Sequence, residues 1–279
     1  MIIIGGYYLA KILLDKYYTS PDLAKYIVDK TKEIIGEENI TEYIEPSAGA
    51  GVFLDYLDEL GNDYLAYDIE PEDDKNRIVK CDFLELDLQY KKGRCVIGNP
   101  PYGIRNTLSV KFFKKSIQLA DYIAFILPSS QYNNNQQMYE FDLIHSELIN
   151  NEGFIELDKR INLAFNIYKK NIKGFNNKPN YKLQNVIIKE ARKGSKNKIT
   201  DDYDIGICSF GWSIGKETDY IGQYANEFYF YINNNFKDKV IRLIKDANWK
   251  QVVAYMTGTE KINQWQVYKY IKEQLPEIN

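Results

Sequence analysis

The sequence predicts an α/β protein in which a doubly wound parallel sheet is followed by a small α+β domain. As far as about residue 150, short apolar runs alternate with stretches of helical period, which implies crossover connections and a sheet covered on both faces. Beyond residue 150 the pattern changes to longer strand-like runs, aromatic in part, and two final helices. We predict one domain over residues 1–194 and a second over 195–279, because residues 194–197 read Gly-Ser-Lys-Asn, as a linker does.

The spacing of apolar residues and the positions of capping residues and prolines predict the individual elements. Ser20 and Pro21 precede apolar residues at helical spacing, so a capped helix is expected over residues 21–35. Further helices are expected at 110–119 and from about 237 and 263. FDLIHSELI at 141–149 also has a helical pattern, which makes His145 a surface residue and no catalyst. Strands are expected at residues 43–44, 64–67, 78–79, 95–97, 122–127, 153–157, 185–193 and 228–232.

Composition limits the class of protein. The chain of 279 residues is 44% hydrophobic and 27% charged, which is typical of a soluble globular protein. Its apolar N-terminus, MIIIGGYYLAKILL, lacks a basic leader and is interrupted by glycines and a lysine, so we expect a cytoplasmic protein without a membrane span. The three cysteines lie far apart and share no metal-ligand spacing with the single histidine, so no metal is expected.

The net charge of −3 conceals an uneven distribution. Residues 1–150 carry 15 basic and 24 acidic side chains, whereas residues 151–279 carry 21 basic and 15 acidic. Residues 159–198 contain twelve basic residues and one acidic residue, with four aromatic residues among them. Such a run is often only a solvated face, but rings among cations favour a nucleic acid, because bases stack on rings and cations meet phosphates.

A glycine turn after the first strand is a candidate binding element. EPSAGAG places Gly49 and Gly51 where backbone N–H groups can approach a ligand at a helix N-terminus. Alone, such a turn is often only a tight turn. Asp68, at the end of the next strand, stands where an acid accepts both hydroxyls of a ribose. Glu45, just before the turn, is expected to lie near a cation.

Asp82 and Phe83 add an acceptor and a ring at the same predicted sheet edge. On their own they fit a helix-capping Asp and a core Phe equally well. Together with Glu45 and Asp68, Asp82 makes three carboxylates at the carboxyl ends of successive strands, where doubly wound sheets bind ligands. A ligand with a positive charge, a ribose and an exocyclic amine would use all three, and S-adenosylmethionine has these groups.

The stretch RCVIGNPPYG carries the strongest signal for catalysis. Neither Pro100 nor Pro101 has an N–H to give to a sheet ladder, so the strand must end at Asn99 and the chain must leave in a stiff arc. This arc would present the Asn99 amide and the Tyr102 ring side by side to something planar.

With these motifs in this order, the chain resembles the S-adenosylmethionine-dependent DNA methyltransferases that act on the N6 amine of adenine. The resemblance covers roughly residues 17–190 and rests on YYTSPDLAKYIV, EPSAGAG and NPPY, in the order of the family's gamma arrangement. It implies a Rossmann-like, mostly parallel sheet with a late antiparallel strand, and a target-recognition domain at the C-terminal end. Double-stranded DNA is then the expected partner. The resemblance is also compatible with a cognate restriction nuclease as a second partner, in a restriction–modification system.

The resemblance also implies roles for residues that bind the cofactor. Ser20 stands where the family usually has a proline, which leaves the backbone path there open, and Ser47 replaces the family's more familiar aromatic or small apolar residue. The positions that match cofactor-binding residues are Tyr18, Thr19, Pro21, Glu45, Gly49, Gly51, Asp68, Asp82, Phe83 and Asn99.

The catalytic positions of the family correspond to Asn99, Pro100, Pro101 and Tyr102. The Asn99 side-chain oxygen and the Pro100 carbonyl would each accept one hydrogen of the adenine amine. The Tyr102 ring would stack on the flipped base without using its hydroxyl. Phe165 matches an aromatic residue that clamps the base, with Phe175 as its competitor.

The basic stretch supplies the expected DNA contacts, through Lys169, Lys170 and Lys173. The same clamp fits any planar amine or amide, so an rRNA or a protein glutamine is the alternative substrate. A catalytically inactive nucleic-acid-binding module is a third interpretation, against which the complete NPPY motif argues.

Overall fold

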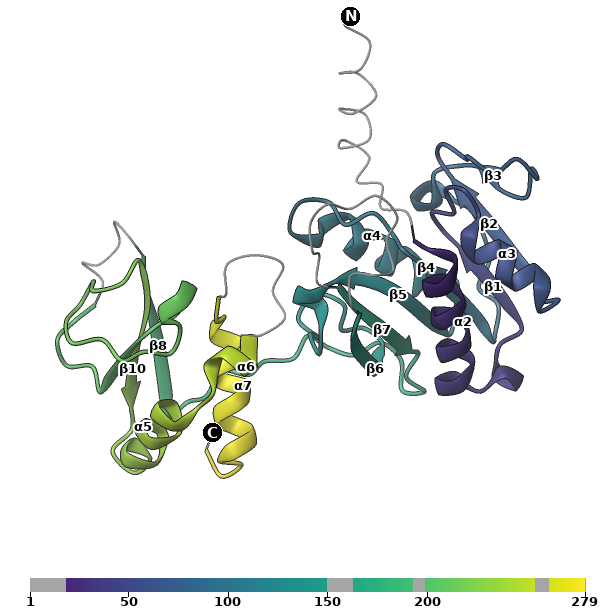
Figure 1. The fold of residues 1–279 in the computed structure, drawn as a ribbon. Helices are drawn as coiled ribbons and strands as arrows, with labels where there is room; N and C mark the ends of the chain where they lie inside the picture. Colours follow the sequence, from purple (N-terminus) through teal and green to yellow (C-terminus); the bar gives the residue numbers. More distant parts are fainter. Residues whose placement is uncertain (1–18, 150–162, 193–198, 254–260, 279) are drawn as a thin grey trace, which may run out of the picture. The chain divides into compact units, whose positions relative to one another are not determined.

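The computed structural model describes residues 19–149, 163–192, 199–253 and 261–278. The chain divides into two compact units, Met1–Pro179 and Asn180–Asn279, each with its own sheet and helices (Figure 1). The first unit contains α2 (Pro21–Ile35), β1 (Glu42–Glu45), α3 (Val52–Glu59), β2 (Tyr64–Asp68), β3 (Val79–Lys80), β4 (Arg94–Gly98), α4 (Thr107–Ser116), β5 (Tyr122–Pro128), β6 (Asp142–Ile149) and β7 (Leu163–Lys169).

The seven strands of the first unit form one sheet in the order β3-β2-β1-β4-β5-β7-β6. All of them are parallel except β7, which runs antiparallel to both of its neighbours. The order reverses direction beside β1, as in other doubly wound sheets. This architecture confirms the predicted α/β class, with a Rossmann-like, mostly parallel sheet and one late antiparallel strand.

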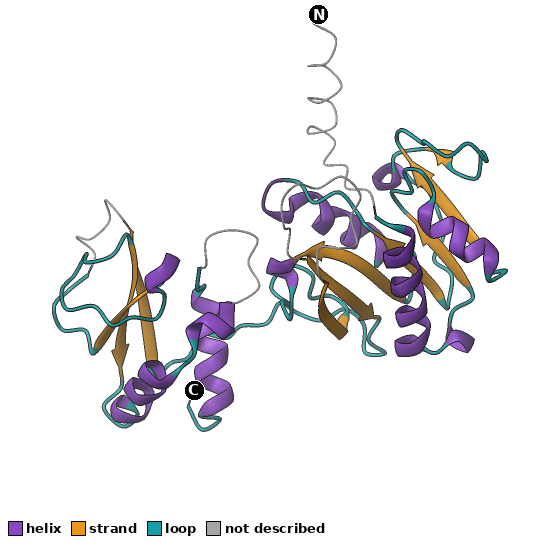
Figure 2. Ribbon diagram, viewed as in Figure 1, coloured by secondary structure: helices purple, strands orange, loops and turns teal. Residues whose placement is uncertain are grey.

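Helices cover both faces of this sheet, as Figure 2 shows. Side chains alternate between the faces along each strand: in β4, Cys95 and Ile97 pack in the cluster that contains α2 and α3, whereas Val96 packs in the cluster that contains α4. The central strands β4 and β5 are buried along their whole length. Their near-continuous apolar sequence follows from burial on both faces.

Helix α2 begins where the sequence predicts. The Ser20 hydroxyl accepts a hydrogen bond from the Leu23 N–H at 3.2 Å, and Pro21 occupies the first turn. The helix ends at Gly36, whose φ of +85° suits glycine. The buried side of α2 carries Leu23, Ala24, Ile27, Val28, Thr31 and Ile35.

Residues 142–149 form a strand, so the prediction of a helix around His145 was wrong. The strand β6 pairs with β7 along its length, with a register irregularity between Leu143 and His145. FDLIHSELI satisfies both a helical and an alternating pattern, and the ladder with β7 decides between them. The predicted strand at 153–157 lies outside the described residues.

The second unit is a small α+β domain built on a three-stranded antiparallel sheet in the order β8-β10-β9. Its core joins this sheet to α5 and α7. The elements are β8 (Val186–Arg192), β9 (Ile205–Cys208), β10 (Asn226–Ile232), α5 (Lys237–Asp246), α6 (Trp249–Val253) and α7 (Gln264–Gln274).

The domain boundary lies earlier than the predicted 194/195. β8 was expected to be a late strand of the first domain, but it pairs with β10 over seven residues, from Asn226 opposite Arg192 to Ile232 opposite Val186. The units therefore separate between Pro179 and Asn180. No helix in the described part of the chain is both long enough and apolar enough to cross a membrane.

Candidate functional site

The carboxyl ends of β1, β2 and β4 meet at one edge of the sheet, and most of the predicted site residues lie there. β1 ends at Glu45, β2 ends at Asp68, and Asn99 directly follows β4. Because these strands are adjacent and parallel, the side chains that follow them are neighbours in space. Thr19 is brought to the same edge by its contact with Asn99. Tyr18 lies outside the described residues.

The Asn99 amide is held between two hydroxyl groups. Its Nδ2 donates to Thr19 Oγ1 at 3.4 Å, and its Oδ1 accepts from the Tyr102 hydroxyl at 2.9 Å. The Asn99 backbone carbonyl accepts from the Ser47 hydroxyl at 3.3 Å. An amide oxygen is a hydrogen-bond acceptor, and the Tyr102 hydroxyl restrains the position of Oδ1.

Tyr102 differs from the prediction in the part of the side chain that it uses. The residue is only 7% exposed, and its ring belongs to the buried cluster that α2 shares with the sheet. Its backbone carbonyl accepts from the N–H groups of Leu108 and Ser109, which ties the motif to α4. The ring therefore does not present a free face for a base, and the hydroxyl, expected to be idle, contacts Asn99.

The two glycines of the turn have different surroundings. Gly49 and Gly51 both have positive φ, at +52° and +79°. A Cβ on Gly49 would meet nothing within 4 Å, whereas a Cβ on Gly51 would lie 2.8 Å from Arg77 Nη2 and 3.3 Å from Asp73 Oδ1. The space beside Gly49 is therefore open, although its N–H donates to Asp68 and its carbonyl accepts from the Glu72 N–H. Gly51 makes room for the Arg77–Asp73 ion pair.

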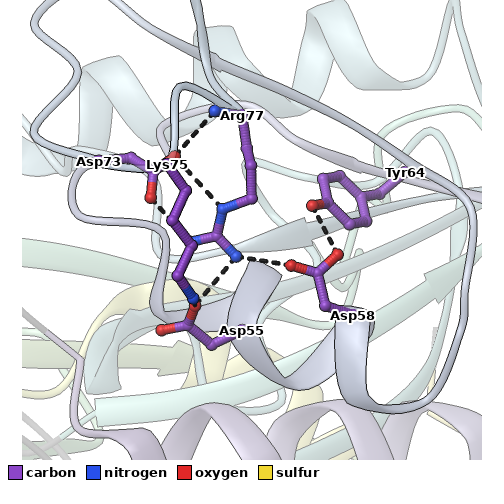
Figure 3. A network of polar contacts seen from close by, with 6 residues as sticks. All are labelled: Asp55, Asp58, Tyr64, Asp73, Lys75 and Arg77. Carbon is purple, nitrogen blue, oxygen red and sulfur yellow. Dashed lines mark hydrogen bonds and ion pairs between the residues drawn. The ribbon is translucent and has the colours of Figure 1, made fainter.

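Arg77 fixes the loop that follows β2 to the helix that follows the glycine turn (Figure 3). Its guanidinium contacts Asp73 at 2.7 Å, Asp58 at 2.7 Å and Asp55 at 2.9 Å. The hydrogen bond from Arg77 to Asp73 lowers the pKa of the Asp73 carboxyl to about 2. Since Asp55 and Asp58 lie on α3, the loop is held to that helix, and the turn lies between two restrained segments. The sequence analysis did not identify Arg77 as a site residue. The acidic residues that precede it in the chain could have indicated that it forms ion pairs.

Glu45 and Asp68 are both buried at the sheet edge, but only Asp68 is satisfied. Asp68 accepts from the N–H groups of Gly49 and Glu70, each at 2.8 Å. Glu45 is 2% exposed, and its Oε2 has no hydrogen-bond partner among the described residues. Burial, with the nearby Asp68 charge as a second cause, raises the pKa of Glu45 well above its ordinary value. A cation next to Glu45 would remove this penalty.

Asp82 and Phe83 adopt the capping and core positions that the sequence left open. Asp82 accepts from the Leu84 N–H at 2.9 Å and caps the short 3₁₀ helix Phe83–Glu85. Phe83 is buried and stacks on Phe112 of α4, with the ring centroids 5.4 Å apart. Their predicted contact with an adenine ring stays a prediction.

The structure leaves Phe165 without an exposed face and places the three lysines away from the clamp. Phe165 was expected between two strands but lies inside β7, fully buried and paired with Ile126. Lys169 is opposite Tyr122, at the start of β5. It therefore lies about 20 Å along the strand from the edge that carries the site. Lys170 and Lys173 follow Lys169 at this far edge, so none of the three contacts a base held by Asn99.

Two further polar residues donate hydrogen bonds to the loop after β5. Asn106, in the left-handed conformation with φ of +63°, donates to Ser130 Oγ at 3.0 Å. Asn166, buried on β7, donates to the Gln131 carbonyl at 2.8 Å. The run SSQ after β5 was not assigned a role from the sequence.

Within the described ranges no three His, Cys, Asp or Glu side chains are arranged to hold a metal ion.

The fold and the site together define a class: a Rossmann-like α/β domain with a ligand-binding edge at the carboxyl ends of its parallel strands. No family model and no curated protein matches the chain.

Several solved structures resemble the chain. A Pyrococcus horikoshii protein, provisionally described as an RNA methyltransferase, is 17% identical, covering 58% of this chain and 91% of its own with a TM-score of 0.45. Thermoplasma acidophilum 1320 is 19% identical, covering 57% of this chain and 94% of its own with a TM-score of 0.43. The 23S rRNA methyltransferase ErmE is 14% identical, covering 56% of this chain and 70% of its own with a TM-score of 0.40. At this level of similarity, function must be argued from the chain's own residues.

Proposed function

We propose that the chain transfers a methyl group from S-adenosylmethionine to the N6 amine of adenine in DNA. The observation that carries the proposal is the Asn99 amide, held by Thr19 and Tyr102 at the carboxyl end of β4. Its oxygen is restrained by the Tyr102 hydroxyl. Such a group is suited to a planar amine, whose two hydrogens need two acceptors in one plane.

The residues beside the clamp fit the proposed cofactor. Glu45 has a buried carboxylate oxygen without a partner among the described residues, and a positively charged ligand would supply one. Gly49 leaves open space where its side chain would be, so a ligand can approach the backbone closely. S-Adenosylmethionine would supply a methyl group bound to a positively charged sulfur, and that carbon–sulfur bond would break as the carbon–nitrogen bond forms, with neutral S-adenosylhomocysteine as the leaving group.

The clamp residues act on the amine. An adenine amine is a poor nucleophile because its lone pair is delocalised into the ring. When Asn99 Oδ1 and the Pro100 carbonyl each accept one amine hydrogen, the nitrogen becomes more tetrahedral and its lone pair becomes available for a bond to carbon. Pro100 and Pro101 hold the acceptors in place beforehand, so little ordering entropy is lost in the reaction. The nitrogen then releases one proton to solvent.

The second unit, residues 180–279, is the proposed target-recognition domain. Its residues follow the late strand β7 in the chain, as a recognition domain does in the gamma arrangement. The clamp itself accepts other planar amines and amides, so rRNA and a protein glutamine are the substrates against which DNA has to be tested.

The decisive experiment is methyl transfer from labelled S-adenosylmethionine to duplex DNA, rRNA and a release factor in separate reactions. We expect label in DNA, recovered as N6-methyladenine after digestion to nucleosides. Asn99→Ala should abolish the transfer, while calorimetry should show cofactor affinity within a few fold of wild type. Label in rRNA or protein alone would contradict the choice of DNA, and no cofactor binding would contradict the whole proposal.

A further inference from the structure

The segment directly after the clamp exposes an apolar side chain beside a cation. Ile104 is 83% exposed, and its neighbour Arg105 is exposed as well. Within the described part of the chain, the Arg105 side chain makes no hydrogen bond or ion pair. Most apolar side chains of this unit are buried in its core clusters. Single exposed apolar residues are common on protein surfaces, and Ile172 is exposed even more fully. The inference therefore depends on the backbone and the charge that accompany Ile104, not on its exposure alone.

The backbone holds these two side chains in a fixed position. Gly103, Arg105 and Asn106 all have positive φ, at +66°, +55° and +63°, a conformation that is unfavourable for the two residues that are not glycine. The Asn106 side chain donates to Ser130 Oγ at 3.0 Å, and the Arg105 carbonyl accepts from Gln137 Nε2 at 3.5 Å. The loop after β5 thus anchors the segment, and the exposure of Ile104 is built into the fold.

The charge around this segment selects the kind of partner. From Gly98 to Leu119 the chain carries four basic residues and no acidic residue, although residues 1–150 are acidic overall. Helix α4, which begins directly after the segment, has three lysines and no acidic residue, and of these lysines Lys114 is paired with Glu140. A partner with a negatively charged backbone and apolar surfaces between its charges fits this combination, and a nucleic-acid strand has both features.

We infer that Ile104 and Arg105 contact the nucleic-acid strand that contains the target base. Ile104 occupies the space that the base leaves when it is extruded toward Asn99, and Arg105 binds an adjacent phosphate. Removing a base from the stack is costly, and an inserted apolar side chain offsets part of that cost. The inference rests on the proposed function and adds to it the residues that hold the strand open beside the clamp.

The test uses the full chain and two DNA pools of the same random sequences, one duplex and one single-stranded. Methyl transfer from labelled S-adenosylmethionine is measured for Ile104→Ala and Arg105→Gln, and binding of the dye-labelled pools is followed by fluorescence anisotropy. Ile172→Ala and Lys92→Gln are matched controls, since both residues are exposed at the opposite edge of the sheet. Thermal unfolding checks that each variant is folded.

For Ile104→Ala we expect the rate on duplex DNA to fall roughly tenfold and the rate on single strands to change less than about twofold, because a single strand needs no wedge. For Arg105→Gln we expect weaker binding of both pools. The slope of log affinity against log salt should become flatter by about 0.9 on duplex and about 0.7 on single strands, as for one lost phosphate contact. The controls should match wild type in every measurement.

Two failures are distinguishable. If wild type labels a protein and neither nucleic acid, the proposed function is wrong and this inference is wrong with it. If wild type labels DNA but Ile104→Ala matches Ile172→Ala on both pools, only the wedge is wrong. An unchanged salt slope for Arg105→Gln likewise removes the phosphate contact. Should wild type label rRNA in place of DNA, the same comparison with duplex and single-stranded RNA pools decides the inference.

Discussion

At the scale of single residues, two hydroxyl groups hold the Asn99 amide. Thr19 contacts its Nδ2, and the Tyr102 hydroxyl donates to its Oδ1. NPPY as a sequence motif identifies the clamp, but it does not reveal that Tyr102 is buried or that its hydroxyl is used. Removing the hydroxyl oxygen of Tyr102 therefore tests whether it positions Asn99 Oδ1.

Tyr102→Phe keeps the ring and its packing but removes the hydrogen bond to Asn99. We expect kcat for methyl transfer to fall on the order of fivefold to tenfold, since a neutral hydrogen bond is worth about 1 kcal/mol. The KM for S-adenosylmethionine should stay within a few fold. Thr19→Val, which releases the other end of the amide, should act in the same direction. A Phe variant with wild-type kcat would leave only the ring with a role.

Glu45 makes stability depend on pH. Its pKa is raised in the folded chain, because burial and the nearby Asp68 disfavour the charged form. The folded state then holds a proton that the unfolded state releases near pH 4.5. Without cofactor, we expect the free energy of unfolding to decrease as pH rises from 4.5 toward the folded pKa. Urea titrations across this range measure the effect.

Glu45→Gln is the control for this pH dependence, because glutamine has the shape of the protonated acid and does not titrate. The variant should be at least as stable as wild type at neutral pH and should lack this component of the pH dependence. It should also bind S-adenosylmethionine more weakly if Glu45 faces the cofactor's positive charge. An equally steep pH profile in the variant would assign the effect to other groups.

At the scale of elements, the glycine turn depends on a neighbouring loop. The Arg77 network joins α3 to the loop after β2, and Gly51 leaves the space in which the guanidinium lies. The sequence pattern Gly-x-Gly assigns the same role to both glycines, whereas the structure leaves open space beside Gly49 and packs Gly51 against Arg77.

Gly51→Ala should destabilise the fold by about 1–3 kcal/mol, because alanine is strained at positive φ and its Cβ would meet Arg77 at 2.8 Å. Gly49→Ala adds strain but no collision, so it should destabilise less and weaken cofactor binding more. Thermal or urea unfolding and calorimetry measure the two effects. In an Arg77→Ala background the cost of Gly51→Ala should shrink, and a constant cost would show that collision with Arg77 is not the cause.

At the scale of the whole molecule, pairing between distant strands sets the boundary between the units. The linker-like residues 194–197 lie inside the second unit, because β8 before them and β10 after them share a ladder. Val186 and Ile188 of β8 belong to the core of that unit.

A fragment of residues 180–279 should therefore fold cooperatively, whereas a fragment of residues 195–279 should not. The shorter fragment lacks β8, which leaves one edge of β10 unpaired and removes two core side chains. Circular dichroism and thermal unfolding of the two fragments provide the comparison. A cooperative transition in the shorter fragment would place the boundary back at 194/195.

The three lysines at the far edge of the sheet give a second prediction at this scale. Replacing Lys169, Lys170 and Lys173 together with Gln should leave methyl transfer to short oligonucleotides unchanged, because these residues lie about 20 Å along β7 from the clamp edge. Arg105→Gln is the comparison that should reduce binding. If the triple variant flattens the salt dependence by about three units, the basic stretch contacts phosphates as the sequence indicates.

The sequence by itself determined the α/β class, the elements from α2 to β5, the cap of α2, the ends of the central strands and the location of Glu45 and Asp68 at the carboxyl ends of adjacent strands. These features depend on local period, on proline and glycine chemistry, and on the rule that parallel strands end at one edge. Tertiary structure alone decided that residues 142–149 form a strand, that β8 belongs to the second sheet and that Phe165 is buried. Each depends on a partner strand far away in the chain, and a local pattern contains no information about which partner is present. For the same reason Tyr102 could be recognised from its motif, while the direction of its hydroxyl could not.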